Sequence, residues 1–165
     1  MSDATRPTGP MPAQLSALYQ ELILDHYRRP RNRGTLDPAD ETVAMKNPIC
    51  GDEITLTMSF DGDRLAEVKF AGAGCSISQA SASMMTQLVR GKSVAETERL
   101  IERLGEMLKG DAAAAADERL GDLRALSGVA RLPVRFKCAT LAWTALQRAL
   151  VERRRLSHNA GGPAE

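Results

Sequence analysis

Three cysteines stand far apart in this chain, and a site that unites them requires a fold that brings distant segments together. Cys50 is followed by Gly51 and Asp52, so a thiol and a carboxylate flank the most flexible kind of residue. Cys75 and Cys138 come much later in the sequence. Three thiols and one carboxylate form a ligand set that suits tetrahedral zinc. The sequence therefore predicts a metal site made of Cys50, Asp52, Cys75 and Cys138.

The surroundings of the cysteines distinguish one from the other two. Cys75 and Cys138 each stand where a helical pattern begins, and a helix N-terminus favours a thiolate. Cys50 lies in a loop, which leaves it the freest to move. Arg135 and Lys137 add positive charge beside Cys138. Taken by itself, each cysteine could instead be a small hydrophobic residue buried in the core, with no role in metal binding.

The hydrophobic pattern changes its period along the chain. Helical spacing of apolar residues comes first, strict alternation follows, and helical spacing then returns. Asp61-Gly62 separates two alternating segments and predicts a hairpin turn. Ser93 and Glu96 form a capping box for a following helix. The pattern predicts an α+β fold, a small three-stranded antiparallel sheet with helices packed on one face. The predicted strands are 42–46, 53–60 and 64–70, and the predicted helices are 13–29, 77–91, 93–109 and 138–154.

The length of 165 residues and the apolar content of 43% indicate one domain with a substantial core. We expect this domain to span 13–155, between a disordered leader at 1–12 and a flexible tail at 156–165. An alanine-rich stretch within about 105–125 is interpreted as a surface insertion. A short helix is expected over Leu120–Leu126.

Charge and hydropathy exclude several classes of function. The chain has 22 basic and 21 acidic residues, a net charge of +1, which argues against a dedicated nucleic-acid binder. No apolar run reaches the roughly 18–20 residues that a membrane span needs. The first residues lack the apolar core of a signal peptide. An odd number of cysteines in such a chain favours metal or thiol chemistry over disulfides. We therefore expect a cytoplasmic location.

Other residues with reactive or charged groups are interpreted as structural. His26 lies on the first predicted helix and is expected to be structural or to face a partner. Met84 and Met85 are expected in the core rather than as copper ligands. Arg31 and Arg33 could pair with carboxylates or dock a partner, and the structural role is favoured.

Several motifs together resemble the U-type iron–sulfur cluster assembly family, over about Leu15 to Leu150. The resemblance implies the α+β fold and implies that Cys50, Asp52, Cys75 and Cys138 bind one zinc ion per chain. The matching segments are Asp25–Gly34, Asn47–Asp52, Gly72–Met85, Gly91–Ser93 and Val134–Trp143.

Within that family the chain is most similar to the SufU branch. The IscU branch has a histidine immediately before the last cysteine, where this chain has Lys137. It also has a Leu-Pro-Pro-Val-Lys chaperone-recognition motif, whereas this chain reads Leu132-Pro133-Val134-Arg135. The stretch between Cys75 and Cys138 is longer than in IscU, which the alanine-rich segment would explain.

The SufU resemblance implies a zinc-dependent sulfurtransferase. Its expected partner is a pyridoxal-phosphate cysteine desulfurase of the SufS type, with a SufBCD-type scaffold as a further partner. We expect Cys50 to accept the persulfide sulfur, after a ligand swap with a partner side chain releases it from the metal. Arg135 is expected to orient the acceptor loop or to dock the partner, by pairing with Asp52. The alternatives are a scaffold that holds a nascent [2Fe–2S] cluster and a zinc-stabilised interaction module without catalytic activity.

Overall fold

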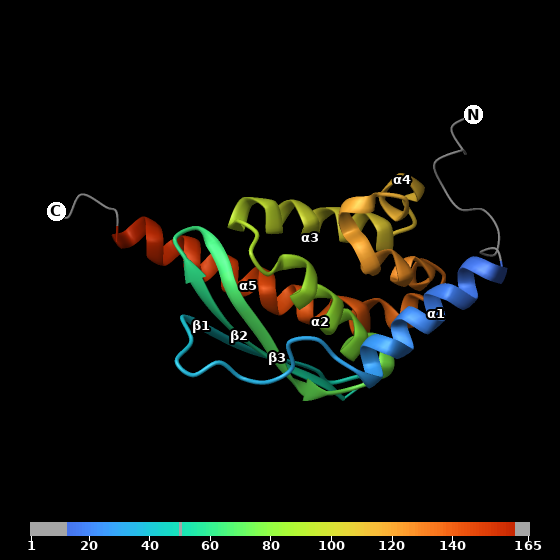
Figure 1. Ribbon diagram of the computed structural model, residues 1–165, viewed down its shortest axis with the longest axis horizontal. Helices are drawn as coiled ribbons and strands as arrows, with labels where there is room; N and C mark the ends of the chain where they lie inside the picture. Colours follow the sequence, from blue (N-terminus) through green and yellow to red (C-terminus); the bar gives the residue numbers. More distant parts are fainter. Residues whose placement is uncertain (1–12, 50, 161–165) are drawn as a thin grey trace.

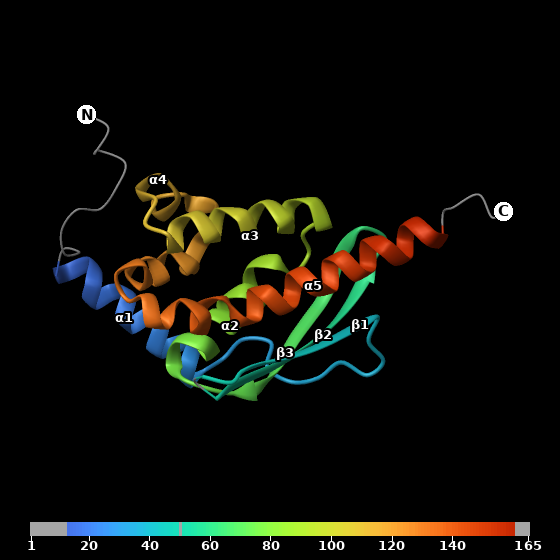
Figure 2. The same cartoon turned by 180° about the vertical axis from the view of Figure 1, so that it is seen from behind.

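The computed structural model describes residues 13–49 and 51–160. A three-stranded sheet in the order β1-β2-β3 forms one layer, and helices α2 and α5 lie across one of its faces (Figure 1). Figure 2 shows the same arrangement from behind, with α5 running along the helical layer. The predicted α+β architecture is therefore confirmed. The expected leader at 1–12 lies outside the described residues.

The three strands form an antiparallel meander. They are β1 (Glu41–Asn47), β2 (Asp52–Asp61) and β3 (Arg64–Ala73). Asn47 pairs with Asp52 at one end of the sheet, and Gly62 turns the chain between β2 and β3 at the other with a φ of 64°. The alternating residues Ile54, Leu56 and Met58 are buried against the helices, as the sequence pattern predicts.

Four longer helices supply most of the apolar core, and α2 lies among the other three. They are α1 (Ala13–Arg28), α2 (Ser76–Val89), α3 (Val94–Leu108) and α5 (Phe136–Ala160). Helix α2 is buried along most of its length, which accounts for its small residues and for the core positions of Met84 and Met85. The capping box predicted for Ser93 and Glu96 is present at the start of α3. None of the described helices is long and apolar enough to cross a bilayer.

The segment after α3 contributes more to the core than expected. It contains the short helix α4 (Ala112–Ala115) and the 3-10 helical segment η2 (Glu118–Arg131), which is interrupted at Gly121. Leu120, Leu123 and Leu126 of η2 are fully buried. The short helix expected over Leu120–Leu126 is present as part of η2, in 3-10 geometry. In the alanine-rich stretch, Ala113 and Ala116 are exposed and Ala114 is buried. That the segment is an insertion stays a prediction.

Helix α5 is longer at both ends than predicted. A single 3-10 turn, η3 (Pro133–Arg135), leads directly into Phe136, so Cys138 lies inside the first turn rather than at the start. The helix then continues to Ala160, beyond the predicted end at 154. That the residues from 156 onward are flexible stays a prediction. The rest of that expected tail, 161–165, lies outside the described residues.

His26 forms a buried polar cluster with Ser83 and Asp122 that links α1, α2 and η2. The Nδ1 atom of His26 lies 2.8 Å from Ser83 Oγ, and its Nε2 atom lies 2.9 Å from Asp122 Oδ2. Ser83 Oγ also accepts a hydrogen bond from the Arg31 backbone N–H. Because a carboxylate only accepts, Nε2 carries the donated proton, and both ring nitrogens have partners. The structural role expected for His26 is therefore confirmed.

Candidate metal centre

The fold brings three of the four predicted ligands to one place. Asp52 begins β2, Cys75 precedes α2, and Cys138 lies in the first turn of α5. One ligand atom from each of the three lies within 4.8 Å of the others. Cys50, the fourth predicted ligand, lies outside the described residues. The prediction that distant segments converge is confirmed for Asp52, Cys75 and Cys138.

The two carboxylate oxygens of Asp52 differ: one accepts a hydrogen bond, and the other has no partner among the described residues. Its side chain is buried, and Oδ1 accepts a hydrogen bond of 3.1 Å from the Cys75 backbone N–H. Oδ2 is also buried, yet no hydrogen-bond donor among the described residues reaches it. A buried carboxylate oxygen without a partner is unfavourable. A cation held between Oδ2 and the two sulfurs would satisfy this atom.

Cys75 occupies the N-cap position of α2. Its backbone is extended, and its Sγ atom accepts a hydrogen bond of 3.5 Å from the Ser78 backbone N–H. The unpaired N–H groups and the positive end of the helix macrodipole favour a negative sulfur at this position. The sequence predicted this placement from the helical pattern that follows Cys75.

Two glycines before Cys75 permit the close approach of the ligand-bearing segments. A Cβ atom at Gly72 would lie 2.2 Å from the Glu53 carbonyl oxygen in β2. A Cβ atom at Gly74 would lie 2.6 Å from Asp52 Oδ1 and 2.4 Å from Ser78 Oγ. At Gly72 the contact is with backbone, so only glycine fits there. At Gly74 a larger residue would have to displace the side chains of Asp52 and Ser78.

Arg135 interacts with the cysteines rather than with the carboxylate that the sequence suggested. It lies in η3 with an exposed side chain. A hydrogen bond to Cys138 raises the pKa of its guanidinium, and the negative charges of Cys75 and Cys138 raise it further. Asp52 is not among the groups that shift this pKa. The expected Arg135–Asp52 pair is therefore replaced by contact with the sulfur side of the centre.

Sequence reasoning passed over Asn47, which organises the turn before Asp52. Its backbone carbonyl accepts from the Gly51 N–H at 2.8 Å, and its Oδ1 accepts from the Ile49 N–H at 3.2 Å. The side chain is buried, and its Nδ2 atom has no hydrogen-bond partner among the described residues. An asparagine at the end of a strand and just before a proline is a common turn signal, which could have identified it.

Exposed apolar side chains stand close in sequence to the ligands. Ile49 is 83% exposed and Val134 is 79% exposed, and Leu132 is half exposed. Ile49 precedes Cys50, whereas Leu132 and Val134 precede Arg135. Exposed apolar groups in such a setting are typical of surfaces that bind another protein.

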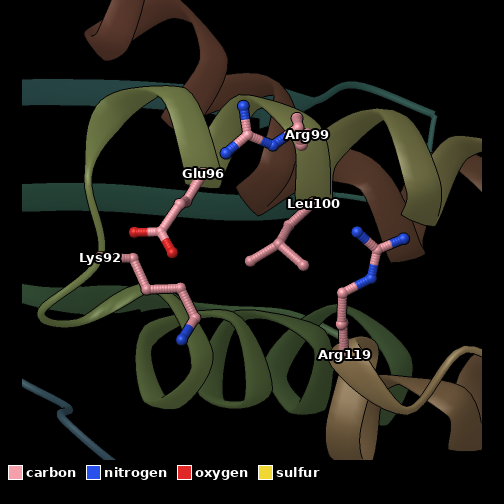
Figure 3. Close-up of a pocket in the computed structure, with 5 residues that line it drawn as sticks. All are labelled: Lys92, Glu96, Arg99, Leu100 and Arg119. Carbon is pink, nitrogen blue, oxygen red and sulfur yellow. The ribbon is translucent and has the colours of Figure 1, made fainter.

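The metal centre is separate from the pocket between α3 and η2. Figure 3 shows that pocket, in which Leu100 lies between the basic side chains of Lys92, Arg99 and Arg119. Its volume is about 220 Å³, and none of the three converging ligands lines it. The Glu96 carboxylate at its rim is occupied by the capping box of α3. The ligand cluster therefore does not depend on this pocket.

The described donors fit zinc. Two sulfurs and one carboxylate oxygen converge, and Cys50 is separated from Asp52 by one residue, Gly51, whose φ is 74°. Thiolate and carboxylate ligands in a set of four are typical of tetrahedral zinc sites. The unpartnered Oδ2 of Asp52 is the observation in the structure that favours a cation here.

Comparison with known proteins shows the family. The NifU-like N-terminal domain matches residues 18–158. The zinc-dependent sulfurtransferase SufU of Bacillus subtilis is 46% identical over 85% of this chain and 94% of its own length. The scaffold protein IscU of Streptococcus pyogenes is also 46% identical, over 84% of this chain and 86% of its own. A crystal structure of a protein described as hypothetical has a TM-score of 0.77 and 46% identity, covering 82% of this chain and 98% of that one.

The match to the family spans the converging ligands and nearly all of the described core. The identity to both curated relatives extends over most of each chain. The family resemblance drawn from the motifs is therefore confirmed, and the chain belongs to the NifU-like N-terminal domain family.

Proposed function

We propose that this protein is a zinc-dependent sulfurtransferase that accepts persulfide sulfur from a cysteine desulfurase for iron–sulfur cluster assembly. The observation that carries the proposal is the convergence of Asp52, Cys75 and Cys138, in which the Oδ2 atom of Asp52 is buried and has no hydrogen-bond partner among the described residues. Similarity to a protein named a zinc-dependent sulfurtransferase supports it. A sulfur carrier needs a protected thiol near the surface, and this cluster lies beside an exposed arginine.

Zinc and this ligand set have complementary roles in the proposal. When bound, zinc holds the coordinating sulfurs as thiolates and protects them from unproductive oxidation. Asp52, Cys75 and Cys138 are the residues that would retain the ion, since rigid elements position all three. Cys50 lies in the turn between β1 and β2 in the sequence, and we assign it the role of acceptor.

The transfer step requires no oxidant or reductant. The Cys50 thiolate attacks the outer sulfur of the persulfide on the desulfurase, and a new sulfur–sulfur bond forms. The bond between that outer sulfur and the desulfurase cysteine breaks, and the electron pair leaves with the desulfurase thiolate. The product is a persulfide on Cys50 and a free thiolate on the partner.

Arg135 is positioned to stabilise negative charge on sulfur during this exchange. Its guanidinium contacts the Cys138 side of the centre, and the cysteine charges raise its pKa. It therefore stays protonated while thiolates form and disappear near it. We assign Arg135 to the catalytic machinery on this basis.

The partner is proposed to be a desulfurase of the SufS type, and a SufBCD-type scaffold is the proposed next recipient. The exposed apolar residues Ile49 and Val134 offer a surface on which the desulfurase could dock beside the metal centre. The near-neutral charge of the chain supports a protein partner rather than nucleic acid. We propose a cytoplasmic location for this exchange.

A scaffold for a nascent [2Fe–2S] cluster is the second candidate function. It is favoured by the relative named as an IscU scaffold, at the same identity as the sulfurtransferase. Cluster ligation would use the same cysteines. Lys137 argues against the scaffold. It is exposed on α5 directly before Cys138, and a lysine is a poor iron ligand compared with the histidine that the IscU branch has at this position. Visible absorption of protein purified without oxygen separates the two candidates, because a zinc protein is colourless.

The acceptor role is tested by Cys50→Ala in a desulfurase assay with a SufS-type enzyme. We expect the wild-type protein to stimulate turnover and the variant to lose that stimulation while it still binds the desulfurase. Mass spectrometry should locate the additional sulfur on Cys50. Sulfur found only on Cys75 or Cys138 would reassign the acceptor, and unchanged stimulation by Cys50→Ala would favour a binding module instead.

The role of Arg135 is tested by Arg135→Ala and Arg135→Lys. We expect the alanine variant to keep zinc and its melting temperature but to lose about tenfold or more of the stimulated rate. Lysine should restore only part of the rate, because a single ammonium cannot span two sulfurs as a guanidinium does. Arg99→Ala, which removes an exposed arginine of the distant pocket, is the matched control. A lower melting temperature with an unchanged rate per folded molecule would limit Arg135 to a structural role.

A further inference from the structure

The two edges of the sheet differ in whether the chain itself covers them. The strand order makes β1 one edge and β3 the other. Along β3, the Phe70 N–H donates to the Asn32 carbonyl at 3.1 Å, and the Phe70 carbonyl accepts from the Gly34 N–H at 2.8 Å. Nearer the hairpin, the Leu65 N–H donates to the Lys92 carbonyl at 2.9 Å. Among the described residues, no segment pairs in this way with the outer side of β1.

The register of the sheet identifies the backbone groups that point to the open edge of β1. Phe70 directs its N–H and its carbonyl away from β2, and it lies opposite Leu56 of β2. Opposed residues of an antiparallel pair either bond to each other or both point away, so Leu56 bonds to β1, where Val43 is its partner. This direction alternates along a strand, so the residues on either side of Val43 point outward. The outward groups of β1 belong to three exposed residues, Thr42, Ala44 and Lys46.

Helix α5 presents basic side chains beside this edge, since it packs against β1 (Figure 2). Burial raises the pKa of Glu41 in β1, and the charge of Glu152 raises it further, so Glu152 lies on the side of α5 that faces β1. Arg148 lies four residues before Glu152 and Arg155 three after it, so both share that side of the helix. Val151 lies between the two arginines, and all three residues are exposed.

Positive charge predominates around the open edge. Arg148 takes part in no ion pair with another described residue, and Lys46 lies 3.9 Å from Glu53 in a pair that is exposed on both sides. The acid on this side of α5, Glu152, is bound by Arg155. A lysine on an edge strand opposes pairing with a basic strand, whereas an acidic strand attracts it. The charges therefore favour an acidic occupant.

A second copy of this chain fits the edge less well. Two β1 strands paired antiparallel about a two-fold axis would place both α5 helices on the same face of the joined sheet. Arg148 and Arg155 of each copy would then face those of the other, and like charges oppose such pairing.

We propose that the outer edge of β1 is a docking site at which an acidic extended segment of a partner protein adds as a fourth strand. Its main chain bonds to the three outward residues of β1, which supplies affinity that does not depend on side chains. Its side chains alternate between the two faces of the sheet. On the α5 side, an apolar residue contacts Val151, and acidic residues two positions before and after it lie near Arg148 and Arg155. The docking site does not depend on the proposed sulfur transfer.

Hydrogen exchange of the zinc-loaded protein tests the open edge. The amides of Thr42, Ala44 and Lys46 should exchange at least about tenfold faster than those of Val43 and Met45, which bond to β2. Ala44→Pro should keep the zinc content and nearly the melting temperature, because an edge strand tolerates proline where the N–H faces solvent. Val43→Pro, the matched control, removes a bond to β2 and should lower the melting temperature sharply. Protection of the Ala44 amide equal to that of Val43 would overturn the proposal.

Binding is tested with the peptide Thr-Glu-Thr-Val-Thr-Glu-Thr, blocked at both ends, by amide NMR of the zinc-loaded protein. We expect a saturable downfield shift of the outward amide protons of β1, as hydrogen bonds form, and no saturable shift at Lys46 in Ala44→Pro. A peptide with lysine in place of both glutamates should bind at least about tenfold more weakly. Arg148→Glu should weaken binding of the acidic peptide about fivefold. Arg99→Glu, which reverses an exposed charge on α3, is the matched control and should leave binding unchanged.

The absence of a saturable shift at the β1 amides would overturn the docking site. Equal binding of the lysine peptide would overturn the acidic partner. Shifts that grow with protein concentration in the absence of peptide would identify a second copy as the occupant and overturn the proposal. No desulfurase takes part in these measurements, so a failed transfer assay would refute the proposed function and leave the docking site intact.

Discussion

Two buried polar clusters of this protein differ in whether the protein satisfies its own hydrogen bonds. In the cluster around His26, both ring nitrogens have partners, and Ser83 also accepts from a backbone N–H. In the metal centre, Asp52 Oδ2 and Asn47 Nδ2 are buried without partners among the described residues. The first cluster is complete within the described residues, whereas the second has two buried atoms that no described residue satisfies.

Both clusters bring together segments far apart in the sequence, so convergence by itself does not distinguish a structural cluster from a functional site. The distinction lies in the atoms that converge. A histidine between a carboxylate and a hydroxyl satisfies all three groups, whereas two thiols and a carboxylate offer several acceptors and few donors. An excess of converging acceptors indicates a cation site.

Removal of zinc should produce the largest effect and would test the incomplete cluster directly. If free zinc stands about 1,000-fold above its dissociation constant, chelation should lower the free energy of unfolding by about 4 kcal/mol. For a domain of this size that corresponds to a drop in melting temperature of about 10 °C. Calorimetry before and after chelation, with metal analysis, measures it. Cys75→Ser should reproduce the loss of metal, and an unchanged melting curve after chelation would remove the distinction between the clusters.

A somewhat smaller effect is expected for His26→Ala, which disrupts the complete cluster. Truncation leaves Asp122 and Ser83 without their partner and opens a cavity, so we expect a loss of about 3 kcal/mol. Zinc content should not change. Tyr27→Ala, an exposed neighbour on α1, is the control and should stay within about 0.5 kcal/mol of wild type. Denaturant titration together with metal analysis decides, and loss of zinc in His26→Ala would show that the two clusters are coupled.

Substitution of Glu41 should have the smallest effect on stability. It tests most directly whether a buried oxygen without a partner is enough to make a metal site. Its Oε2 atom is also buried without a partner among the described residues, but no thiols converge on it. Burial raises the pKa of this carboxyl, and the nearby Glu152 raises it further, against the opposing charge of Arg153. The folded protein therefore holds this proton more tightly than the unfolded chain. Its contribution to stability is complete at acid pH and is lost as the pH rises through the raised pKa.

Glu41→Gln should accordingly stabilise the protein near pH 7 by about 0.5–1 kcal/mol and flatten the decline of stability above acid pH. Urea titrations of both proteins between pH 4 and 8 measure this difference. Zinc content should be unchanged, because an unpartnered oxygen without converging ligands does not make a metal site. A destabilised variant at neutral pH would show that Glu41 acts as a partnered group.

The sequence predicted the parts of the fold that depend on local pattern. Alternation located β2 and β3, and helical spacing with caps located α2 and α3. The short helix predicted over Leu120–Leu126 forms as part of the longer η2, whose 3-10 geometry apolar spacing does not distinguish from an α-helix. The predicted end of α5 is too early, because residues 155–160 are mostly polar and give no apolar periodicity from which a helix could be predicted.

The candidate site was predictable as a set of ligands but not as a set of contacts. Cys75, Cys138 and Asp52 were identified from residue type and local setting, and their convergence followed from the chemistry of zinc. The partner of Arg135 was not predictable, because it depends on how η3 enters α5. Asn47 escaped notice because its importance arises from the register that places it opposite Asp52.

The two glycines at the end of β3 have a consequence for anyone who would rebuild this centre in another protein. Gly72 lies against the backbone of β2, and Gly74 lies against the oxygen of a ligand. If Asp52, Cys75 and Cys138 were copied onto a new scaffold without glycine at the position of Gly72, a Cβ atom would press against the backbone of β2 and push the two segments apart. The transferable unit is therefore the whole strand-to-helix crossing, in which two absent side chains are as necessary as the ligands that are present.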